Sequence, residues 1–152
     1  MAFPPSKAMA CALDEARAAA ARGEVPVGAV VTDASGRVLA QAGNRTRELA
    51  DPTAHAEILA IRQACAVLAS ERLTGCTLTV TLEPCAMCAA AIAAARLDRV
   101  IYGASDPKSG GVEQGARVFS HPQSHHRPEV VAGVAEAESA ALLKDFFAGR
   151  RT

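Results

Sequence analysis

The sequence predicts an α/β fold with parallel strands, on the evidence of three features. A hairpin pattern near the N-terminus is followed by segments that alternate strand, helix, strand, helix and strand, which is typical of a layered sheet with crossover helices. Half of the residues are apolar, which is enough for a sizeable core. The chain has 152 residues and shows neither an internal repeat nor a linker, so residues 1–152 are expected to form one domain.

The individual elements follow from residue patterns. A helix is predicted where apolar residues share one face, as Met9, Leu13 and Ala16 do, and where a glycine ends the pattern. A strand is predicted from a short β-branched run such as residues 25–32. The expected elements are a helix at 6–21, strands at 25–32 and 37–43, a helix at 54–69, a strand at 76–82, a helix at 84–95, strands at 99–103 and 129–132, and a helix at 135–150.

Two segments have further expectations attached. The 54–69 helix is apolar nearly all round, which predicts that it is buried on all sides. Residues 106–127 are rich in glycine and proline and have weak periodicity, so they are interpreted as a long loop with a short helix near 113–119. Long ordered loops often carry function.

An H-x-E motif and a later P-C-x-x-C motif carry the residues of a metal site. His55, Cys85 and Cys88 offer one imidazole and two thiolates, a good donor set for one Zn²⁺ ion per chain. A structural zinc usually takes four protein ligands, whereas a catalytic zinc takes three and leaves one position for water. Three ligands with Glu57 as a nearby carboxylate therefore favour catalysis over scaffolding.

The spacing within each motif predicts how the site is built. Cys85 and Cys88 are three residues apart, so they share a face of one helix. His55 and Glu57 are two apart and can converge only if a helix points its N-terminal end at the metal. Residues 51–53 supply candidate caps for such a helix. We therefore expect two helices aimed end-on at one zinc ion.

Each motif has a plainer explanation when it is taken alone. A single C-x-x-C can be a redox pair or half of a structural zinc site, although no second C-x-x-C is present. His55 could be a satisfied core histidine, and Glu57 could be a first-turn glutamate favoured by the helix dipole. The joint occurrence of both motifs in register favours a zinc enzyme over all of these.

The similarity to a known family extends beyond the two motifs. The chain resembles the bacterial tRNA adenosine deaminase family (TadA), which belongs to the cytidine deaminase-like zinc deaminases with the H-x-E and P-C-x-x-C signature. The resemblance covers the chain from about Met9 to Arg151. The segments that carry it are Glu24 to Val30, Gly43-Asn44, Asp51 to Glu57, Thr79 to Cys85 and Asp145-Phe146-Phe147.

This resemblance implies a three-layer α/β/α fold with a five-stranded mixed sheet. It also implies a hydrolase that acts on an amidine C–N bond and converts adenosine to inosine at the wobble position of a tRNA. The partners would be a tRNA anticodon stem-loop and a second copy of the chain in a homodimer. Glu57 would take a proton from water activated by the metal, then pass protons to a ring nitrogen and to the leaving amine.

Three substrate contacts near the metal are implied as well. Asn44 follows a strand and would hydrogen-bond the base or the ribose of a flipped nucleotide. Asp106 would hold a ribose hydroxyl or the neighbouring backbone, and Lys108 would meet a phosphate. Asn44 could otherwise be an ordinary turn asparagine, and without the resemblance the loop charge pair would not stand out.

Two further features are assigned to the RNA surface. Phe147, beside Arg150 and Arg151, would stack on unpaired bases, although the sequence leaves open whether Phe146 or Phe147 faces the substrate. Three histidines have no fixed acidic partner for a second metal site and are interpreted as loop residues near the RNA: His121, His125 and His126.

Two other functions remain open. A deaminase of the same fold could act on a free base such as guanine or cytosine. A zinc-stabilised binding module without turnover is the second alternative, and it would have no need of Glu57.

Composition sets the remaining expectations. Sixteen basic and sixteen acidic residues cancel, whereas nucleic-acid binders are usually basic, so RNA affinity must come from local clusters or from two pooled surfaces. Cys11, Cys65 and Cys76 are expected to be buried free thiols, which implies a reducing compartment. No signal sequence or membrane-length apolar run is present, so the expected location is the cytoplasm.

Overall fold

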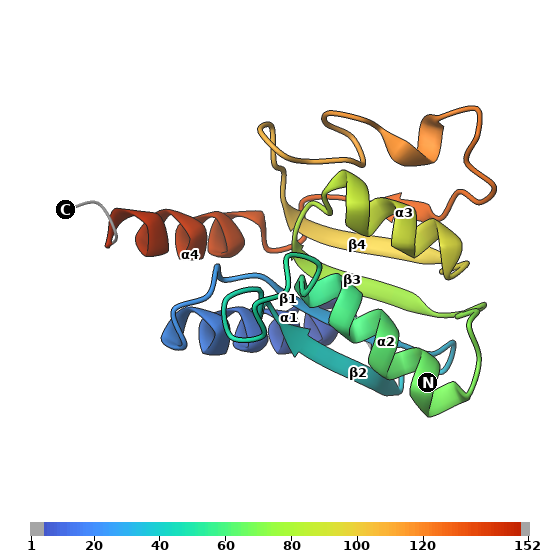
Figure 1. The fold of residues 1–152 in the computed structure, drawn as a ribbon, viewed down its shortest axis with the longest axis horizontal. Coiled ribbons are helices and arrows are strands. Elements are labelled where there is room, and N and C mark those ends of the chain that lie inside the picture. Colours follow the sequence, from blue (N-terminus) through green and yellow to red (C-terminus); the bar gives the residue numbers. More distant parts are fainter. Residues whose placement is uncertain (1–4, 150–152) are drawn as a thin grey trace.

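The computed structural model describes residues 5–149, which form one five-stranded sheet with helices on both faces (Figure 1). The sheet has the strand order β2-β1-β3-β4-β5. The elements in chain order are α1 (Pro5–Ala21), β1 (Gly28–Thr32), β2 (Val38–Gly43), α2 (Ala56–Leu68), β3 (Thr77–Leu82), α3 (Ala86–Ala94), β4 (Arg99–Ala104), a 3-10 turn (Val118–Ser120), β5 (Glu129–Val131) and α4 (Glu136–Ala148).

The sheet is mixed, as expected. β1 is antiparallel to both of its neighbours, β2 and β3, whereas β3 pairs with β4 and β4 with β5 in parallel. It follows that β2, β3 and β4 point the same way, which confirms the parallel crossovers predicted from the alternation of strands and helices. The parallel pairing of β5 settles a direction that the sequence left open.

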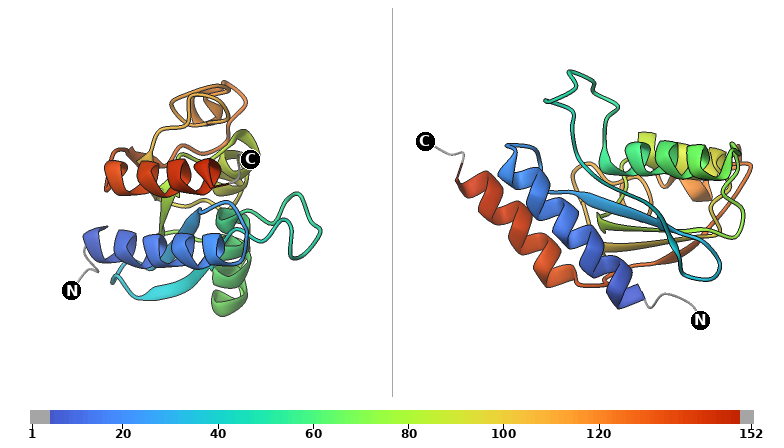
Figure 2. Two further views of the ribbon diagram at one scale, coloured as in Figure 1. Left: turned by 90° about the vertical axis from the view of Figure 1, so that its left-hand side faces the viewer. Right: turned by 90° about the horizontal axis from the view of Figure 1, so that it is seen from below.

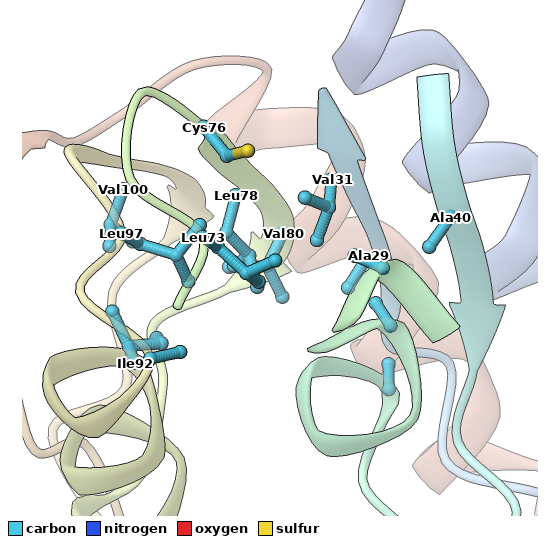
Figure 3. Packing of buried hydrophobic residues seen from close by; sticks show 14 of the residues in the cluster. Ala29, Val31, Ala40, Leu73, Cys76, Leu78, Val80, Ile92, Leu97 and Val100 are labelled. Carbon is cyan, nitrogen blue, oxygen red and sulfur yellow. The ribbon is translucent and has the colours of Figure 1, made fainter. Parts of the chain in front are cut away.

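The helices form two outer layers. α1 and α4 lie side by side on one face, and α2 and α3 cover the other (Figures 1 and 2). The larger core lies between the sheet and the α2–α3 layer, where Ile92 of α3 meets Leu73, Leu78 and Leu97 (Figure 3). A smaller core between α1 and the sheet contains Met9. The predicted three-layer α/β/α fold is therefore confirmed.

β1 begins three residues later than predicted. Pro26 has no N–H to give to a strand, and the N–H of Val27 bonds to the carbonyl of Val25 (2.8 Å) instead. Gly28 then starts the strand directly beneath α1, where a Cβ atom would lie only 1.9 Å from the carbonyl oxygen of Ala12. Glycine at this position allows the helix to rest on the strand backbone.

Two predictions about helices are wrong. α2 is not buried all round, because Arg62, Gln63 and Val67 lie on an exposed face and only its inner side meets the sheet. No helix forms over 113–119, where only the 3-10 turn is present. Gly115 and Arg117 both have positive φ angles (54° and 45°), which an α-helix cannot accommodate.

Candidate active site

The N-terminal ends of α2 and α3 meet at the carboxyl edge of β3. His55 is the N-cap residue of α2 and Cys85 is the N-cap residue of α3, and both have extended backbone conformations. Neither helix has a side-chain cap, so His55 and Cys85 are available to turn toward each other. The predicted arrangement of two helices directed end-on at one point is confirmed.

The predicted caps of α2 are not used as expected. Oδ1 of Asp51 accepts hydrogen bonds from the backbone N–H (2.9 Å) and the hydroxyl (2.7 Å) of Thr53, which closes a turn ahead of the helix. The helix then starts only at Ala56, two residues later than expected. This shift matters because it places His55 at the helix end, with Glu57 inside the first turn.

His55, Cys85 and Cys88 form the one group within residues 5–149 whose ligand atoms are gathered as a metal site requires, all within 4.8 Å of one another. Nδ1 of His55 lies 3.6 Å from Sγ of Cys85 and 3.4 Å from Sγ of Cys88. A tetrahedral ion with ordinary Zn–N and Zn–S bonds would separate N from S by about 3.6 Å. The three donor atoms therefore fit a zinc-sized tetrahedral ion.

The protons of this group are coupled. A hydrogen bond from Cys88, together with nearby His55, lowers the pKa of Cys85 to about 4, despite the opposing effect of burial. The same hydrogen bond and burial raise the pKa of Cys88, while the hydrogen bond with Cys85 raises that of His55. One thiolate is therefore already favoured, and a bound cation would remove the second thiol proton, since a coordinating thiol is deprotonated.

Glu57 adjoins the three donors and is almost completely buried (4% exposed). Burial raises the pKa of its carboxyl to about 7, although its own backbone N–H and the nearby His55 act in the opposite direction. A bound cation would favour the ionised form. Burial and a bound cation would therefore act in opposite directions on the pKa of this carboxyl.

A cavity of about 230 Å³ leads to this group. His55, Glu57, Cys85 and Asn44 are all among its lining residues. Asn44 is buried, and its backbone is held by hydrogen bonds to Val27 (3.1 Å) and from Arg22 (3.2 Å). Its Nδ2 donates to the hydroxyl of Thr46 at 3.4 Å. The structure therefore brings Asn44 to the cavity, as predicted.

A second hollow of about 710 Å³ continues from this cavity, and the two share Val25, Leu82, Asp106 and Ser109 as lining residues. The second hollow is called the outer groove below. Its other lining residues are Ser105, Lys108, Leu143 and Phe147. All four predicted substrate-contact residues therefore line one connected space.

Asp106 and Lys108, two loop residues that line this space, differ in what their side chains contact. Oδ1 of Asp106 accepts the backbone N–H groups of Lys108 (3.2 Å) and Ser109 (3.0 Å), so this oxygen holds the loop. The side chain of Lys108 is exposed at the groove.

Burial shows which of the two phenylalanines of α4 faces outward. Phe147 is 49% exposed and lines the outer groove, whereas Phe146 is half-buried and meets Phe147 edge-on at 5.4 Å between ring centroids. Phe147 is thus the aromatic residue that faces outward. Arg150 and Arg151, predicted beside it, lie outside the described residues.

The three histidines of the long loop do not converge. The Nδ1 atom of His121 accepts the N–H of Gln123 (3.1 Å), and Nε2 of His126 meets the carbonyl oxygen of Leu97 (2.6 Å). His126 lines a hollow that lacks the predicted active-site residues, whereas His121 and His125 line an alanine-rich one beside α3. These positions agree with their interpretation as loop residues, and their expected place near the RNA surface stays a prediction.

Sequence reasoning missed Glu83, Val25, Leu82 and Leu143. The last three line the site as apolar wall residues and have no distinctive sequence signal. Glu83 is buried (2% exposed), although it is a charged residue. A lone acid between an apolar strand and Pro84 was a usable signal, because buried carboxylates must find partners.

Comparison with known proteins identifies the family of this chain. Residues 5–151 match the family model of the MafB19-like deaminases. The chain is 59% identical over 143 residues to the tRNA-specific adenosine deaminase of Agrobacterium fabrum, covering 94% of this chain and 93% of the relative. The chain belongs to the tRNA-specific adenosine deaminase family. The family model adds that this is a deaminase domain along almost its whole length.

Solved structures of other deaminases are similar in fold to this member of the adenosine deaminase family. A structure from work on A-to-I editing by tRNA:A34 deaminases at the wobble position is 59% identical, with a TM-score of 0.89, covering 91% of this chain and 99% of the other. A guanine deaminase from Nitrosomonas europaea is 26% identical, with a TM-score of 0.78, covering 96% and 86% of the two chains. The fold is thus shared by deaminases of different substrates.

Proposed function

We propose that this protein binds one zinc ion per chain and hydrolytically converts adenosine to inosine at the wobble position of a tRNA anticodon. The observation that carries the proposal is the His55, Cys85 and Cys88 donor set with buried Glu57 beside it at the end of a cavity. Membership of the tRNA-specific adenosine deaminase family supports this choice of substrate.

His55, Cys85 and Cys88 would hold the metal. When bound, zinc would lower the pKa of water toward neutrality, to about 7. Glu57 accepts a proton from the water nucleophile, donates one to the ring nitrogen of the base and assists the departure of the amino group as ammonia. A C–O bond replaces the C–N bond, and no redox change occurs. One buried carboxyl serves all of these transfers because it can both accept and donate.

The shape of the site favours a polynucleotide over a free base. The inner cavity can take one flipped base, and the outer groove continues from it toward Lys108 and Phe147. A cation and an exposed aromatic ring suit a phosphate and an unpaired neighbouring base. Asn44 and Asp106 both line the inner cavity, where Asn44 would bond the base or the ribose and Asp106 would hold a ribose hydroxyl or the neighbouring backbone.

The direct test is a comparison of substrates. Purified protein is incubated with an anticodon stem-loop, free adenosine, guanine and cytosine, and ammonia and inosine are measured. We expect turnover only on the stem-loop. Turnover of guanine or cytosine alone would support the free-base alternative, and binding without turnover would support a binding module. The Glu57→Gln variant is the matched control for contaminating deaminases.

We also infer that a second copy of the chain docks against α3. The outer side of this helix exposes Met87 and small residues. Beside it lies an alanine-rich hollow of about 540 Å³. Ala90→Arg should convert a dimer to a monomer in sedimentation velocity experiments, and Ala18→Arg on the exposed side of α1 should not. An unchanged sedimentation coefficient for Ala90→Arg would exclude this face.

The chain is proposed to work as a single cytoplasmic domain. All five strands of the described residues belong to one sheet, which supports the single domain. Among the described residues, no helix is both long and apolar enough to span a membrane. Fractionation of cells that produce the tagged protein would test the location.

A further inference from the structure

Residues 105–114 form an irregular loop along one wall of the active-site cavity. This loop contains no helix or strand of its own. Asp106 and Ser109 of this loop line both the cavity and the outer groove. A wall that must present these groups to a substrate within a fraction of an ångström requires a fixed anchor. Glu83 is such an anchor, because its carboxylate accepts hydrogen bonds from both ends of this loop.

The carboxylate of Glu83 is surrounded by hydrogen-bond donors from this loop. Its Oε1 accepts the N–H of Asp106 at 3.0 Å and the hydroxyl of Ser105 at 3.3 Å. Its Oε2 accepts three successive backbone N–H groups, which belong to Val112 (3.2 Å), Glu113 (2.8 Å) and Gln114 (2.9 Å). Both oxygens therefore accept hydrogen bonds from the loop.

The loop backbone also rests directly on the turn that carries the metal-ligand cysteines. The N–H of Gly111 donates to the carbonyl of Pro84 (2.8 Å), and Gly110 forms an antiparallel bridge with Cys85. A Cβ atom on Gly110 would lie 2.7 Å from Cδ of Glu83, and one on Gly111 would lie 2.5 Å from the backbone N of Ala86. No side chain fits between the loop and the metal turn.

Glu83 thus connects two parts of the site that lie far apart in sequence. It follows β3 and precedes Cys85 by two residues, whereas its donors come from a segment up to 31 residues later. We propose that Glu83 is a positioning residue, which fixes Asp106 and Ser109 relative to the metal ligands. This role rests on the proposed function, because it concerns the wall against which that substrate would bind.

Glu83→Gln should disrupt the hydrogen bonds of one carboxylate oxygen to the loop and keep those of the other. The glutamine oxygen can still accept the three N–H groups of residues 112–114, but its NH₂ group would face the N–H of Asp106, and two donors repel. The Asp106 end of the loop should therefore be released while the other end stays bound. Loss of a hydrogen bond to a charged group should raise KM for an anticodon stem-loop about tenfold or more, while kcat changes little.

Three measurements on the full chain test the proposal. Amide hydrogen exchange without substrate should become faster at Asp106 in Glu83→Gln and stay unchanged in the β3 and β4 strands. Zinc content should remain at the parent level. Tyr102→Phe is the matched control, because it removes the hydrogen bond from Tyr102 to the Glu113 side chain and leaves the Asp106 end attached. It should change neither exchange at Asp106 nor KM.

The outcomes are distinct. Unchanged exchange at Asp106, or a loss of zinc in parallel with activity, would overturn the positioning role. If the parent does not act on the stem-loop, the proposed function fails, while the exchange measurement still tests Glu83. If Glu83→Gln does not fold, Glu83→Asp keeps the charge with a shorter reach, so it should also speed exchange at one end of the loop. Parent-like exchange at both ends in Glu83→Asp would overturn the proposal.

Discussion

Nδ1 of His55 lies 3.4 Å from Sγ of Cys88, although His55 caps α2, Cys88 lies in α3 and the two are 33 positions apart in the sequence. This proximity requires both helices to begin at the same point of the sheet edge. The carboxyl end of a parallel strand is where α/β folds build their sites, and β3 supplies that edge here. The donor set is therefore a product of topology as well as of residue type.

Removal of a ligand tests the donor set. Cys85→Ala and Cys88→Ser should each lose bound zinc and activity together, with some loss of thermal stability, because metal binding is coupled to folding. Zinc per chain is measured by atomic emission. Cys11→Ser and Cys65→Ser are controls, since both thiols are free and lie outside the donor set. Full zinc occupancy in Cys85→Ala would contradict the assignment.

Glu57→Gln tests the proton role separately from the metal. The amide has the same shape but cannot accept a proton, so turnover of a stem-loop should fall by about 10²–10⁴-fold or more. Zinc content and stem-loop binding should persist, because the three ligands and the groove are untouched. Activity within a few-fold of the parent would mean that Glu57 is only a residue of the first helical turn.

The sequence identified this centre because its signal is local. His55, Glu57, Cys85 and Cys88 are recognisable by residue type and spacing, and the helix ends needed for convergence follow from the same spacing. The fold class followed likewise from alternating patterns. The insertion of β1 between β2 and β3 is a matter of long-range pairing, and no short segment encodes it.

The wall around the metal site was less predictable, because it also depends on contacts between residues far apart in the sequence. The three amides of residues 112–114 turn toward Glu83, which is up to 31 positions earlier, and do not continue into a helix. A helix prediction from local residues could not include that distant carboxylate. Similarly, the outward position of Phe147 depends on how α4 packs beside α1, and neighbouring Phe146 has the same local pattern.

Glu24 gives a prediction about pH and stability. Burial opposes its charge, yet the N–H groups of Glu48 (2.8 Å) and Arg47 (3.1 Å), together with Arg22, hold its pKa below the ordinary 4.5. A lowered folded-state pKa means that the ionised carboxylate stabilises the fold above the unfolded value. This contribution starts to fall below about pH 4.5 and is lost only below the lowered pKa.

Glu24→Gln should therefore lower the free energy of unfolding at pH 7 by about 1–3 kcal/mol and reduce its dependence on acid pH. Urea unfolding between pH 7 and pH 3 measures both. Glu71→Gln is the control, because this side chain is exposed and the substitution should change the free energy of unfolding at pH 7 little. Parallel curves for Glu24→Gln and the parent would show that Glu24 contributes nothing to acid sensitivity.

Lys108 tests the phosphate contact. Lys108→Ala should weaken stem-loop binding and lower the slope of log K against log salt by about one, as expected for the loss of one neutralised phosphate. Binding is measured by fluorescence anisotropy over a salt series. Lys7→Ala removes another exposed lysine, which lies near the start of α1 and lines neither the cavity nor the outer groove, and should leave the slope intact. Equal slopes in both variants would remove Lys108 from the interface.

Phe147 tests the stacking surface of the outer groove. Its ring is 49% exposed, so Phe147→Ala should cost little stability, but loss of one stacked base should weaken stem-loop binding about tenfold or more. Phe147→Trp should retain binding, because a larger ring still offers a face. Phe119→Ala provides the contrast: that ring is buried in the core, so truncation should cost about 3–5 kcal/mol of stability while the folded protein binds normally. Thermal melts and anisotropy separate the two effects, and parent-like binding by Phe147→Ala would show that no base stacks on this ring.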